Sequence, residues 1–364
     1  MERASSKRLA EFGSPRFGSE CLSTPRRLDP LVLSNYIRQI VAMKDDELEL
    51  FVDDWMARKK KTYAETEIWA GSGDKGRDVV GYLTTQRHDG PWHLFQCKQL
   101  KVVLRLADAI KELGKVFYNS AEGSYPLPEA YFFVAPRGVA RPVQELIASP
   151  AKLRAAMIEM WDDHCAKRIV ENATVPMTPE IAARINAFDF SKVHVFDVHR
   201  MLKDPHITPA LVKWFDYDPG DYTPGKTPPE VQVEEEPYLR QLMAAYGERS
   251  GTPFTDIAGV LEDGEFSDHL WDQRTRYFHA AYFKRHYRDN TPEEHLDTFV
   301  DEIYYGVIDT HRRAHADTLT RIDEVMAQAA NVRPSGILSR YARVPVRQGV
   351  CHHFANEGRL PWKR

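Results

Sequence analysis

The sequence of 364 residues has few cysteines and no long apolar run. Its cysteines lie far apart and form no C-x-x-C pair; they are Cys21, Cys97, Cys165 and Cys351. This spacing argues against a disulfide framework or a zinc ribbon and fits a reducing cytoplasm. No stretch of about 18 apolar residues occurs, so no transmembrane helix or membrane association is expected. The N-terminus, MERASSKRLAEFGSPRFGSE, lacks the apolar core of a secretory signal.

The chain also lacks a strong excess of charge. It has 49 Lys and Arg against 53 Asp and Glu, for a formal net charge of −4. That balance excludes a protein coated in basic residues, but it does not exclude a nucleic-acid enzyme with one basic face. Basic residues outnumber acidic ones in 56–118, and acidic residues dominate 216–240. The hydrophobic fraction of 43% is typical of globular domains with their own cores.

The pattern along the chain predicts two domains. Residues 1–28 are rich in Ser, Pro, Gly and Arg and are expected to form a mobile basic tail. Residues 29–215 interleave helical and strand-like segments, which favours an α/β domain with a central sheet flanked by helices. A linker rich in Pro, Gly and Glu is expected at 216–236, followed by a smaller all-α domain at 237–364.

The expected elements follow from apolar periodicity. Helical spacing occurs at 29–41, 45–59 and 104–119, and helices are expected to fill 140–184. Strands are expected at 77–83, 92–98, 130–135 and 193–198. In the C-terminal part, helices are expected at 238–246, 266–287 and 295–329. A polar patch at 310–317 interrupts the stripe of the last helix.

The segment Gly71–Gln99, GSGDKGRDVVGYLTTQRHDGPWHLFQCKQ, is the most informative one. It lacks the Gly-Lys-Ser/Thr of a Walker loop, and it precedes a strand where a dinucleotide fingerprint would open a helix. A hairpin centred on His88 would pair Asp78 with Lys98 and Val80 with Gln96. Asp78, Gln96 and Lys98 would then share one face of the sheet, and apolar residues would point to the other; these are Val79, Leu83, Phe95 and Cys97.

This polar trio fits phosphodiester hydrolysis. Asp78 can hold a hard cation such as Mg²⁺ or Mn²⁺, Gln96 can add a neutral oxygen, and Lys98 can stabilise negative charge or help to deprotonate the nucleophile. A second carboxylate is expected from the preceding helix, with Glu49 as the candidate and Glu47 or Asp53 as alternatives. The competing interpretation is a surface salt bridge between Asp78 and Lys98 beside a glycine turn.

The residues G-S-G-D-x-G-x-D followed by Q-x-K resemble the restriction-endonuclease-like, PD-(D/E)xK superfamily. The resemblance is to the branch with Gln at the middle acidic position, as in Mrr-type and CBASS-effector nucleases. It implies that Asp78 binds the metal, that Gln96-Cys97-Lys98 is the Q-x-K, and that the Cys97 carbonyl is a further metal ligand. Asp74 matches the loop acid. With Gln96 at the middle position, the motif has one carboxylate fewer for binding metal ions than the usual pattern.

The C-terminal third resembles the helical domain of effector subunits in ABC three-component, or Lamassu, anti-phage systems. The resemblance depends on Tyr238-Leu239-Arg240-Gln241-Leu242 and on the ending 349–358, GVCHHFANEG, with Trp362 after it. It implies a nuclease effector held inactive by an SMC-like ATPase subunit and a small third subunit until foreign DNA is sensed. We expect a homo-oligomer, dimer or tetramer, that acts on double-stranded DNA.

Basic residues around the motif are candidates for contacts with DNA. The run Arg58-Lys59-Lys60-Lys61 ends a predicted helix, where cations also suit the helix dipole. Others lie in or near the motif itself. The predicted DNA-binding residues are Lys59, Lys60, Lys61, Lys75, Arg77 and Lys101.

Three other segments allow a functional and a structural interpretation. Cys351-His352-His353 with Asn356 could serve a cysteine hydrolase, but a buried, hydrogen-bonded segment packing with Phe354 and Trp362 is favoured. The basic and aromatic segment 274–288 could contact DNA, although its spacing fits a core stripe better. The length of helix 295–329 slightly favours an interface. An inactive nuclease fold that binds DNA or partners is the alternative function.

Overall fold

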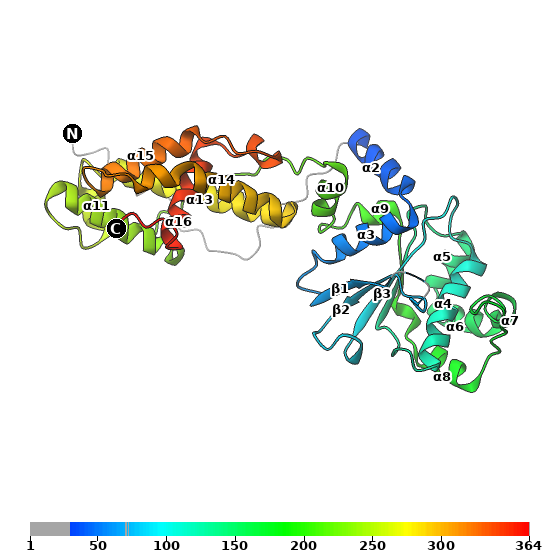
Figure 1. Ribbon diagram of the computed structural model, residues 1–364. Coiled ribbons are helices and arrows are strands. Elements are labelled where there is room, and N and C mark those ends of the chain that lie inside the picture. The colour runs from blue at the N-terminus through cyan, green and yellow to red at the C-terminus, as the bar shows by residue number, and fades with distance from the viewer. Residues whose placement is uncertain (1–29, 70, 72, 364) are drawn as a thin grey trace. The chain divides into compact units, whose positions relative to one another are not determined.

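The computed structural model describes residues 30–69, 71 and 73–363 (Figure 1). The predicted tail at 1–28 and Cys21 lie outside the described residues. The three cysteines that the structure describes, Cys97, Cys165 and Cys351, are buried and unpaired, as expected for a protein without a disulfide framework. Among the described residues, no helix is long and apolar enough to cross a membrane.

The N-terminal region contains one five-stranded mixed sheet. Its strands lie in the order β1 to β5 and comprise Glu65–Ile68, Val79–Tyr82, Trp92–Cys97, Ala130–Val134 and Val193–Phe196. β1, β2 and β3 pair antiparallel, whereas β3, β4 and β5 pair parallel. The predicted α/β class with a central mixed sheet is therefore confirmed. Strand β1 was not predicted, because its four residues, ETEI, carry two charges and no apolar run.

Helices cover both faces of this sheet (Figure 1). One face packs on the end of α2 (Pro30–Ala42), through Ile37, Ile40 and Val41, and on α3 (Asp45–Met56), α9 (Val198–Met201) and α10 (Thr208–Phe215). The other packs on α4 (Leu106–Ala121), α5 (Arg141–Ile147), α6 (Pro150–Glu159), α7 (Trp161–His164) and α8 (Pro179–Ala187). Each face has its own apolar cluster, so the sheet is buried on both sides, as strands with parallel neighbours usually are.

The hairpin register differs from the predicted one by two residues. Val79 pairs with Phe95 and Val80 with Leu94, so the hairpin is centred on Arg87. The strands are joined by the loop 83–91, which contains a short 3-10 turn at Arg87–Asp89 in place of the tight turn centred on His88 that the sequence suggested. Because side chains alternate with a period of two, a shift of two residues leaves every side chain on its predicted face. Val79, Phe95 and Cys97 indeed belong to the cluster under α3.

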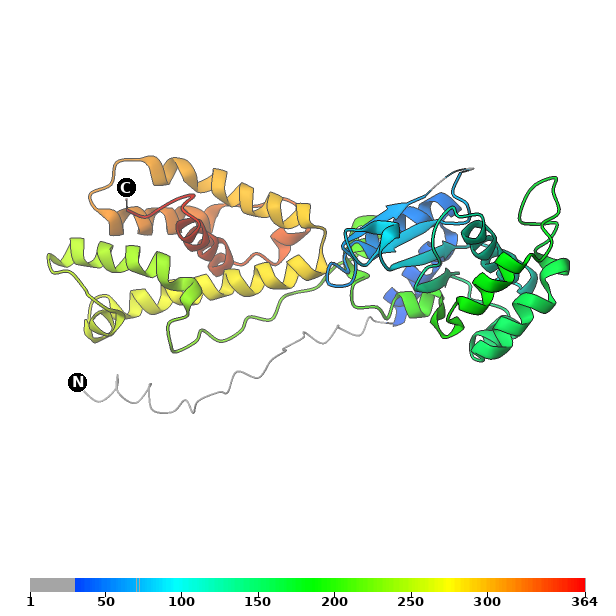
Figure 2. The same cartoon turned by 90° about the horizontal axis from the view of Figure 1, so that it is seen from below.

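The C-terminal region is helical and has its own apolar cluster. Its helices are α11 (Glu236–Ser250), α12 (Ile257–Glu262), α13 (Ser267–Asn290), α14 (Glu293–Arg312), α15 (Thr318–Asn331) and α16 (Val344–Asn356). None of its described residues belongs to a strand. Figure 2 shows α11, α13, α14 and α15 as nearly straight rods, with α16, in red, among them. Predicted helices 238–246 and 266–287 correspond to α11 and α13.

The prediction of a single helix over 295–329 is wrong. The chain breaks after Arg312 into α14 and α15, which pack against each other. The break falls in the polar patch 310–317, where Asp317 caps α15 by accepting a hydrogen bond from the Thr320 N–H. Both helices bury their apolar stripes in the C-terminal cluster, so the length argument for an interface helix no longer holds.

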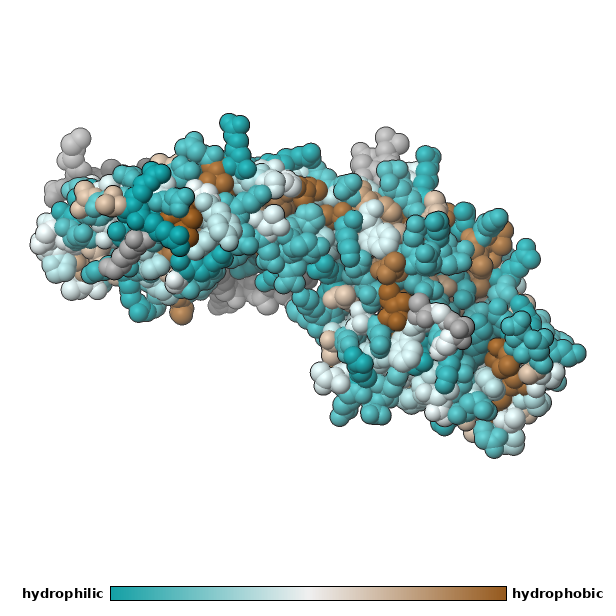
Figure 3. All heavy atoms as spheres, in the orientation of Figure 1, coloured by the Kyte–Doolittle hydropathy of each residue, from teal (hydrophilic) through white to brown (hydrophobic). Residues whose placement is uncertain are grey.

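Residues 216–232 form neither helix nor strand. They include the prolines and glycines on which the predicted linker 216–236 rests, and the predicted domain boundaries stay a prediction. On the face drawn in Figure 3, hydrophilic residues predominate and hydrophobic residues form small separate patches.

Candidate active site

Asp78 lies directly before β2 and turns its carboxylate into the sheet face under α4. It is 5% exposed. Its Oδ2 accepts hydrogen bonds from Gln96 Nε2 at 2.5 Å and from the Cys97 backbone N–H at 2.7 Å. A surface salt bridge between Asp78 and Lys98, the competing interpretation, does not describe a carboxylate at this depth, since burial of a charge needs hydrogen-bonding partners.

Lys98 follows β3 and reaches the same place. Its Nζ lies 3.9 Å from Asp78 Oδ2 and 3.6 Å from Glu112 Oε2 on α4. The predicted convergence of Asp78, Gln96 and Lys98 on one face is therefore confirmed. Their catalytic roles stay a prediction. The position of Lys98 is fixed because its backbone N–H continues the pairing with β4 by donating to the Val134 carbonyl at 2.8 Å.

Burial and neighbouring charges act in opposite directions on the two charged groups of this site. It raises the pKa of Asp78 to about 6, although Lys98 and the hydrogen bonds from Cys97 and Gln96 act in the opposite direction. Burial lowers the pKa of Lys98, but the nearby carboxylates Glu112 and Asp78 outweigh it, so the net pKa is raised. Lys98 is thus a firmly protonated cation, and Asp78 is a carboxylate whose charge lacks full compensation.

The three candidate helix carboxylates occupy different environments. Burial raises the pKa of Glu49 to about 7, and the charges of Asp78 and Lys98 both act on it. Glu47 instead accepts a hydrogen bond from the Lys44 N–H at 2.8 Å and caps α3. Asp53 hydrogen-bonds Thr66. Of the three, Glu49 is the one whose pKa is affected by the charges of both Asp78 and Lys98.

The glycine turn before Asp78 has a defined conformation that is held by a hydrogen bond and by packing on α4. Gly76 has a φ of +80°, and a Cβ there would lie 3.0 Å from Cβ of Lys115 on α4. Asp74 supports the turn, because its Oδ1 accepts the Gly76 N–H at 2.8 Å. The turn therefore needs glycine both for backbone conformation and for close approach to α4.

The donor set can be tested for a divalent cation. Among the residues that the structure describes, no group of three or more His, Cys, Asp or Glu side chains gathers to hold a metal ion. The predicted set is of another kind, with two carboxylates, the Gln96 amide and the Cys97 carbonyl. Gln96 Oε1 is buried and has no hydrogen-bond partner among the described residues. An orphaned oxygen beside a carboxylate suits Mg²⁺, which prefers oxygen ligands.

The predicted DNA-binding residues fall into two groups. Arg77 is buried between the rings of Trp69 and Tyr125, 3.7 and 4.5 Å from their centroids. Lys59 forms a largely buried pair with Asp204 at 2.5 Å. These placements argue against direct phosphate contacts by Arg77 and Lys59. The other four are exposed, and their role stays a prediction; they are Lys60, Lys61, Lys75 and Lys101.

Sequence reasoning missed two residues of this neighbourhood. Glu112 is a buried acid within an otherwise apolar helix face, and its signal was the pattern Lys111-Glu112-x-x-Lys115. Gln99 directly follows the Q-x-K. Its Nε2 lies 2.8–3.0 Å from the carbonyl oxygens of Ile40, Val41 and Met43, where α2 ends. Nothing in the local sequence pointed to that contact.

The C-terminal part of the chain matches a known family. Residues 235–362 match the family model of C-terminal domain 6 (CTD6) of the ABC-three component (ABC-3C) systems. This match supports membership of an ABC-3C defence system. Neither a curated protein nor a solved structure matches the chain. The match covers the helical region that resembled such systems in its sequence, and it does not extend to the α/β region.

Residues 235–362 are called the CTD6 region below. This region buries the segment Cys351-His352-His353, which suggested a cysteine hydrolase. His352 Nε2 bonds Gln273 Oε1 at 3.0 Å, and Trp362 Nε1 donates to His352 Nδ1 at 3.3 Å. Asn356 Oδ1 accepts the Tyr238 N–H at 2.7 Å. Burial raises the pKa of Cys351 to about 12, so its thiol does not ionise near neutral pH. The favoured interpretation, a buried and hydrogen-bonded terminal segment, is confirmed.

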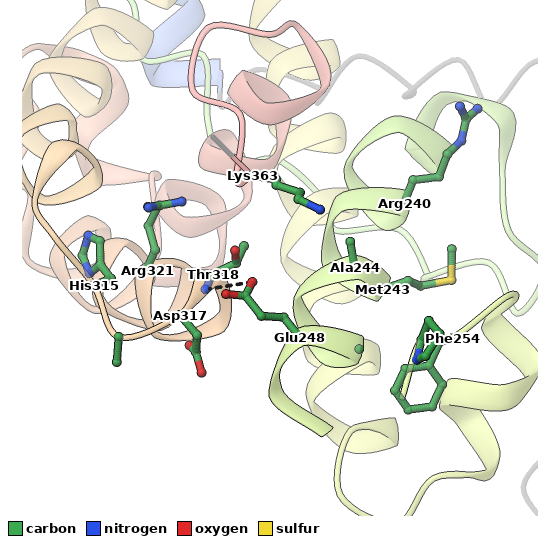
Figure 4. A pocket seen from close by; sticks show the side chains of 13 residues that line it. Arg240, Met243, Ala244, Glu248, Phe254, His315, Asp317, Thr318, Arg321 and Lys363 are labelled. Atoms are coloured by element: carbon green, nitrogen blue, oxygen red, sulfur yellow. Dashed lines mark hydrogen bonds between the residues drawn. The ribbon is translucent and has the colours of Figure 1, made fainter. Parts of the chain in front are cut away.

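Two further features characterise the CTD6 region. In helix α13 the core interpretation of 274–288 is confirmed for Tyr277 and Phe278, whereas Arg285 of the expected stripe is exposed and the buried face continues through Phe283 and Tyr287 instead. An open pocket of about 730 Å³ lies between α11 and the start of α15 (Figure 4). There the Thr318 N–H donates to Glu248 Oε2 at 3.4 Å. The pocket contains none of the predicted site residues and no cluster of metal ligands.

Proposed function

We propose that this chain is a metal-dependent DNA endonuclease that serves as the effector of an ABC-3C anti-phage complex. The observation that carries the proposal is the convergence of the buried Asp78 and Gln96 with the half-buried Lys98, where the orphaned Gln96 Oε1 lies beside a carboxylate of raised pKa. Charge of this kind, buried without full compensation, is costly for folding and is typical of functional sites.

In this proposal Asp78, Glu49, Gln96 Oε1 and the Cys97 carbonyl would hold Mg²⁺ or Mn²⁺. A bound cation of this type polarises a phosphate and lowers the pKa of a coordinated water. The chain's own groups then orient and stabilise. The Asp78 carboxylate is fixed by the Cys97 N–H, and the Lys98 ammonium stabilises negative charge that develops on the phosphate. A raised pKa makes Lys98 better suited to that role than to deprotonating the nucleophile.

The system assignment suggests how such an activity is controlled. We propose that an SMC-like ATPase subunit and a small third subunit hold the effector inactive until foreign DNA is sensed, with the CTD6 region as the partner-binding or oligomerisation part. Support comes from the family match over 235–362. The partners, and a dimeric or tetrameric state, are parts of the proposal.

The direct test is cleavage of plasmid DNA by the purified full-length chain with Mg²⁺, without partner subunits. We expect cleavage that is lost in EDTA and that falls at least about a hundredfold in Lys98→Ala and in Asp78→Ala. An exposed lysine of the same region, Lys192→Ala, is the matched control and should cleave normally. Cleavage that survives both Lys98→Ala and Asp78→Ala would overturn the site assignment.

A second candidate function is favoured by one observation. Because the described residues hold no cluster of three acidic or other metal-ligating side chains, the fold could serve as an inactive interaction subunit. That function predicts binding of DNA or partner subunits without cutting and without dependence on Mg²⁺. The same plasmid assay, combined with a gel-shift measurement, separates the two.

A further inference from the structure

Glu112 is a buried carboxylate that the proposed chemistry does not use. It lies on α4, and its side chain is 3% exposed. Three ammonium groups surround it. Its Oε1 is 3.0 Å from Lys111 Nζ, and its Oε2 is 2.9 Å from Lys115 Nζ and 3.6 Å from Lys98 Nζ. The three lysine side chains are roughly a quarter exposed, at 23%, 28% and 23%. The three ammonium groups are therefore held by the buried Glu112 carboxylate and are still partly open to solvent.

The charges of this group do not balance. One carboxylate faces three ammonium groups, and Asp78 adds a second carboxylate only on the Lys98 side. Burial raises the pKa of Glu112, but Lys98, Lys115 and Lys111 lower it more, so Glu112 stays ionised. The surplus positive charge therefore lies with Lys111 and Lys115. Ammonium groups held this close repel one another, so an anion bound above them would be favoured.

The lysines also have a fixed position relative to the candidate site. Lys115 packs over Gly76, in the turn that leads into Asp78. The same turn is tied to α4 and its following loop at one carbonyl. Asn119 Nδ2 and the Tyr125 hydroxyl both donate to the Lys75 carbonyl, at 2.9 and 2.7 Å. Lys98 belongs to both groups, since its Nζ lies between Asp78 and Glu112. The surplus charge is therefore adjacent to the candidate site.

We propose that Lys111 and Lys115, anchored on Glu112 beside Lys98, form a platform that binds backbone phosphates of the nucleic-acid substrate. This inference rests on the proposed nuclease function and names residues for its substrate contacts. Glu112 acts as a positioning residue, because it is buried and touches no solvent-side ligand. Ammonium groups bind phosphate as point charges without reading base sequence, so the platform fixes the backbone and carries no sequence preference.

The test measures binding of a short fluorescent DNA duplex by anisotropy in EDTA, over a series of salt concentrations. For Lys111→Gln with Lys115→Gln, we expect Kd to rise about tenfold or more. We also expect the slope of log K against log salt to fall by about 1.8, which corresponds to two lost phosphate contacts. The matched control is Lys152→Gln with Lys192→Gln, which removes the same charge from exposed positions of the same region and should leave both values unchanged.

Two further variants keep the outcome interpretable. Removing both lysines leaves Glu112 with fewer partners, so the triple change Lys111→Gln, Glu112→Gln and Lys115→Gln removes the buried charge as well. It should fold normally and show the same weak binding. Lys111→Arg with Lys115→Arg retains the charge and should retain the salt slope.

The proposal is overturned if the lysine variants bind DNA with unchanged Kd and slope while the unmodified chain binds and cleaves. It is also overturned if inorganic phosphate, at the same phosphate concentration, competes as well as the duplex. If the unmodified chain neither binds nor cleaves, the nuclease function and the phosphate platform both fail. If it binds without cleaving and the slope still falls, the platform stands without the nuclease.

Discussion

Two buried polar clusters, one in each region, are built in opposite ways. In the helical region Arg274 pairs with Glu235 through two hydrogen bonds, at 2.6 and 2.9 Å, and also donates to the Glu230 carbonyl. His352 has partners for both ring nitrogens. In the α/β region Gln96 Oε1 finds no partner within the described part of the chain, and Asp78 keeps a raised pKa.

The difference separates two uses of buried polarity. A fully paired cluster specifies how helices and the preceding chain meet, because any other arrangement would leave a charge unpaired. An incompletely paired cluster destabilises the free protein and gains from a ligand that supplies the missing partner. The comparison thus predicts opposite responses to substitution in the two regions.

The largest effect on stability is expected from Glu235→Ala. This change leaves the Arg274 guanidinium buried without its carboxylate, which should lower the free energy of unfolding by about 3–5 kcal/mol. Urea unfolding followed by circular dichroism measures it. Glu236→Ala is the control, because its pair with Arg240 is exposed and its loss should cost less than about 0.5 kcal/mol. Equal losses in the two variants would break the comparison.

A smaller loss is expected from Gly349→Ala in α16. A Cβ at Gly349 would collide with the Arg276 carbonyl and come within 2.9 Å of Ala280 Cβ, both on α13. Overpacking of this kind should cost about 3 kcal/mol. Gly259→Ala, whose Cβ would meet neighbours at 3.6 Å or more, should instead be neutral or gain up to about 1 kcal/mol. Thermal melts of both variants distinguish a tight helix crossing from a general intolerance of alanine.

Acid should loosen α16. Burial lowers the pKa of His353 to about 4, below its unfolded value near 6.5, so the neutral form is favoured by folding. Its stabilisation is complete above pH 6.5 and is lost as the pH falls toward 4, by about 3 kcal/mol. Hydrogen exchange of α16 amides, corrected for intrinsic rates, measures this. His353→Gln keeps a donor for the Tyr277 carbonyl and should make the loss shallower.

The smallest effect, of opposite sign, is expected from Asp78→Asn. The folded pKa of Asp78 is about 6, above the usual 3.8, so ionisation costs stability. This cost is complete above pH 6 and disappears as the pH falls toward 3.8. In EDTA at pH 8 the asparagine variant should therefore be about 1–2 kcal/mol more stable than the unmodified chain, with no gain at pH 4. Destabilisation at pH 8 would mean that Asp78 serves the fold.

Much of the candidate site was predictable because side chains alternate along a strand, so a register error of an even number of residues leaves each side chain on the correct face. The predicted hairpin centre was wrong, yet Asp78, Gln96 and Lys98 converge, since a shift of two residues preserves faces. Other features depended on tertiary packing. From the sequence alone, Glu112 is only a polar residue that interrupts the apolar face of α4, and its burial is seen only in the structure. The break between α14 and α15 was signalled by polar residues, but only the cap at Asp317 makes it a helix start.

The side chain of Gln99 gives the site a mechanical connection. Its side-chain amide donates hydrogen bonds to the Ile40 and Val41 carbonyls at the end of α2. Its backbone N–H donates to Asp45 Oδ1 at the start of α3, at 3.2 Å. Lys98 is the preceding residue. A displacement of the end of α2 or the start of α3 would therefore reach the Lys98 backbone through the Gln99 side chain and a single peptide bond. The end of α2 and the start of α3 are thus held to the residue that directly follows Lys98.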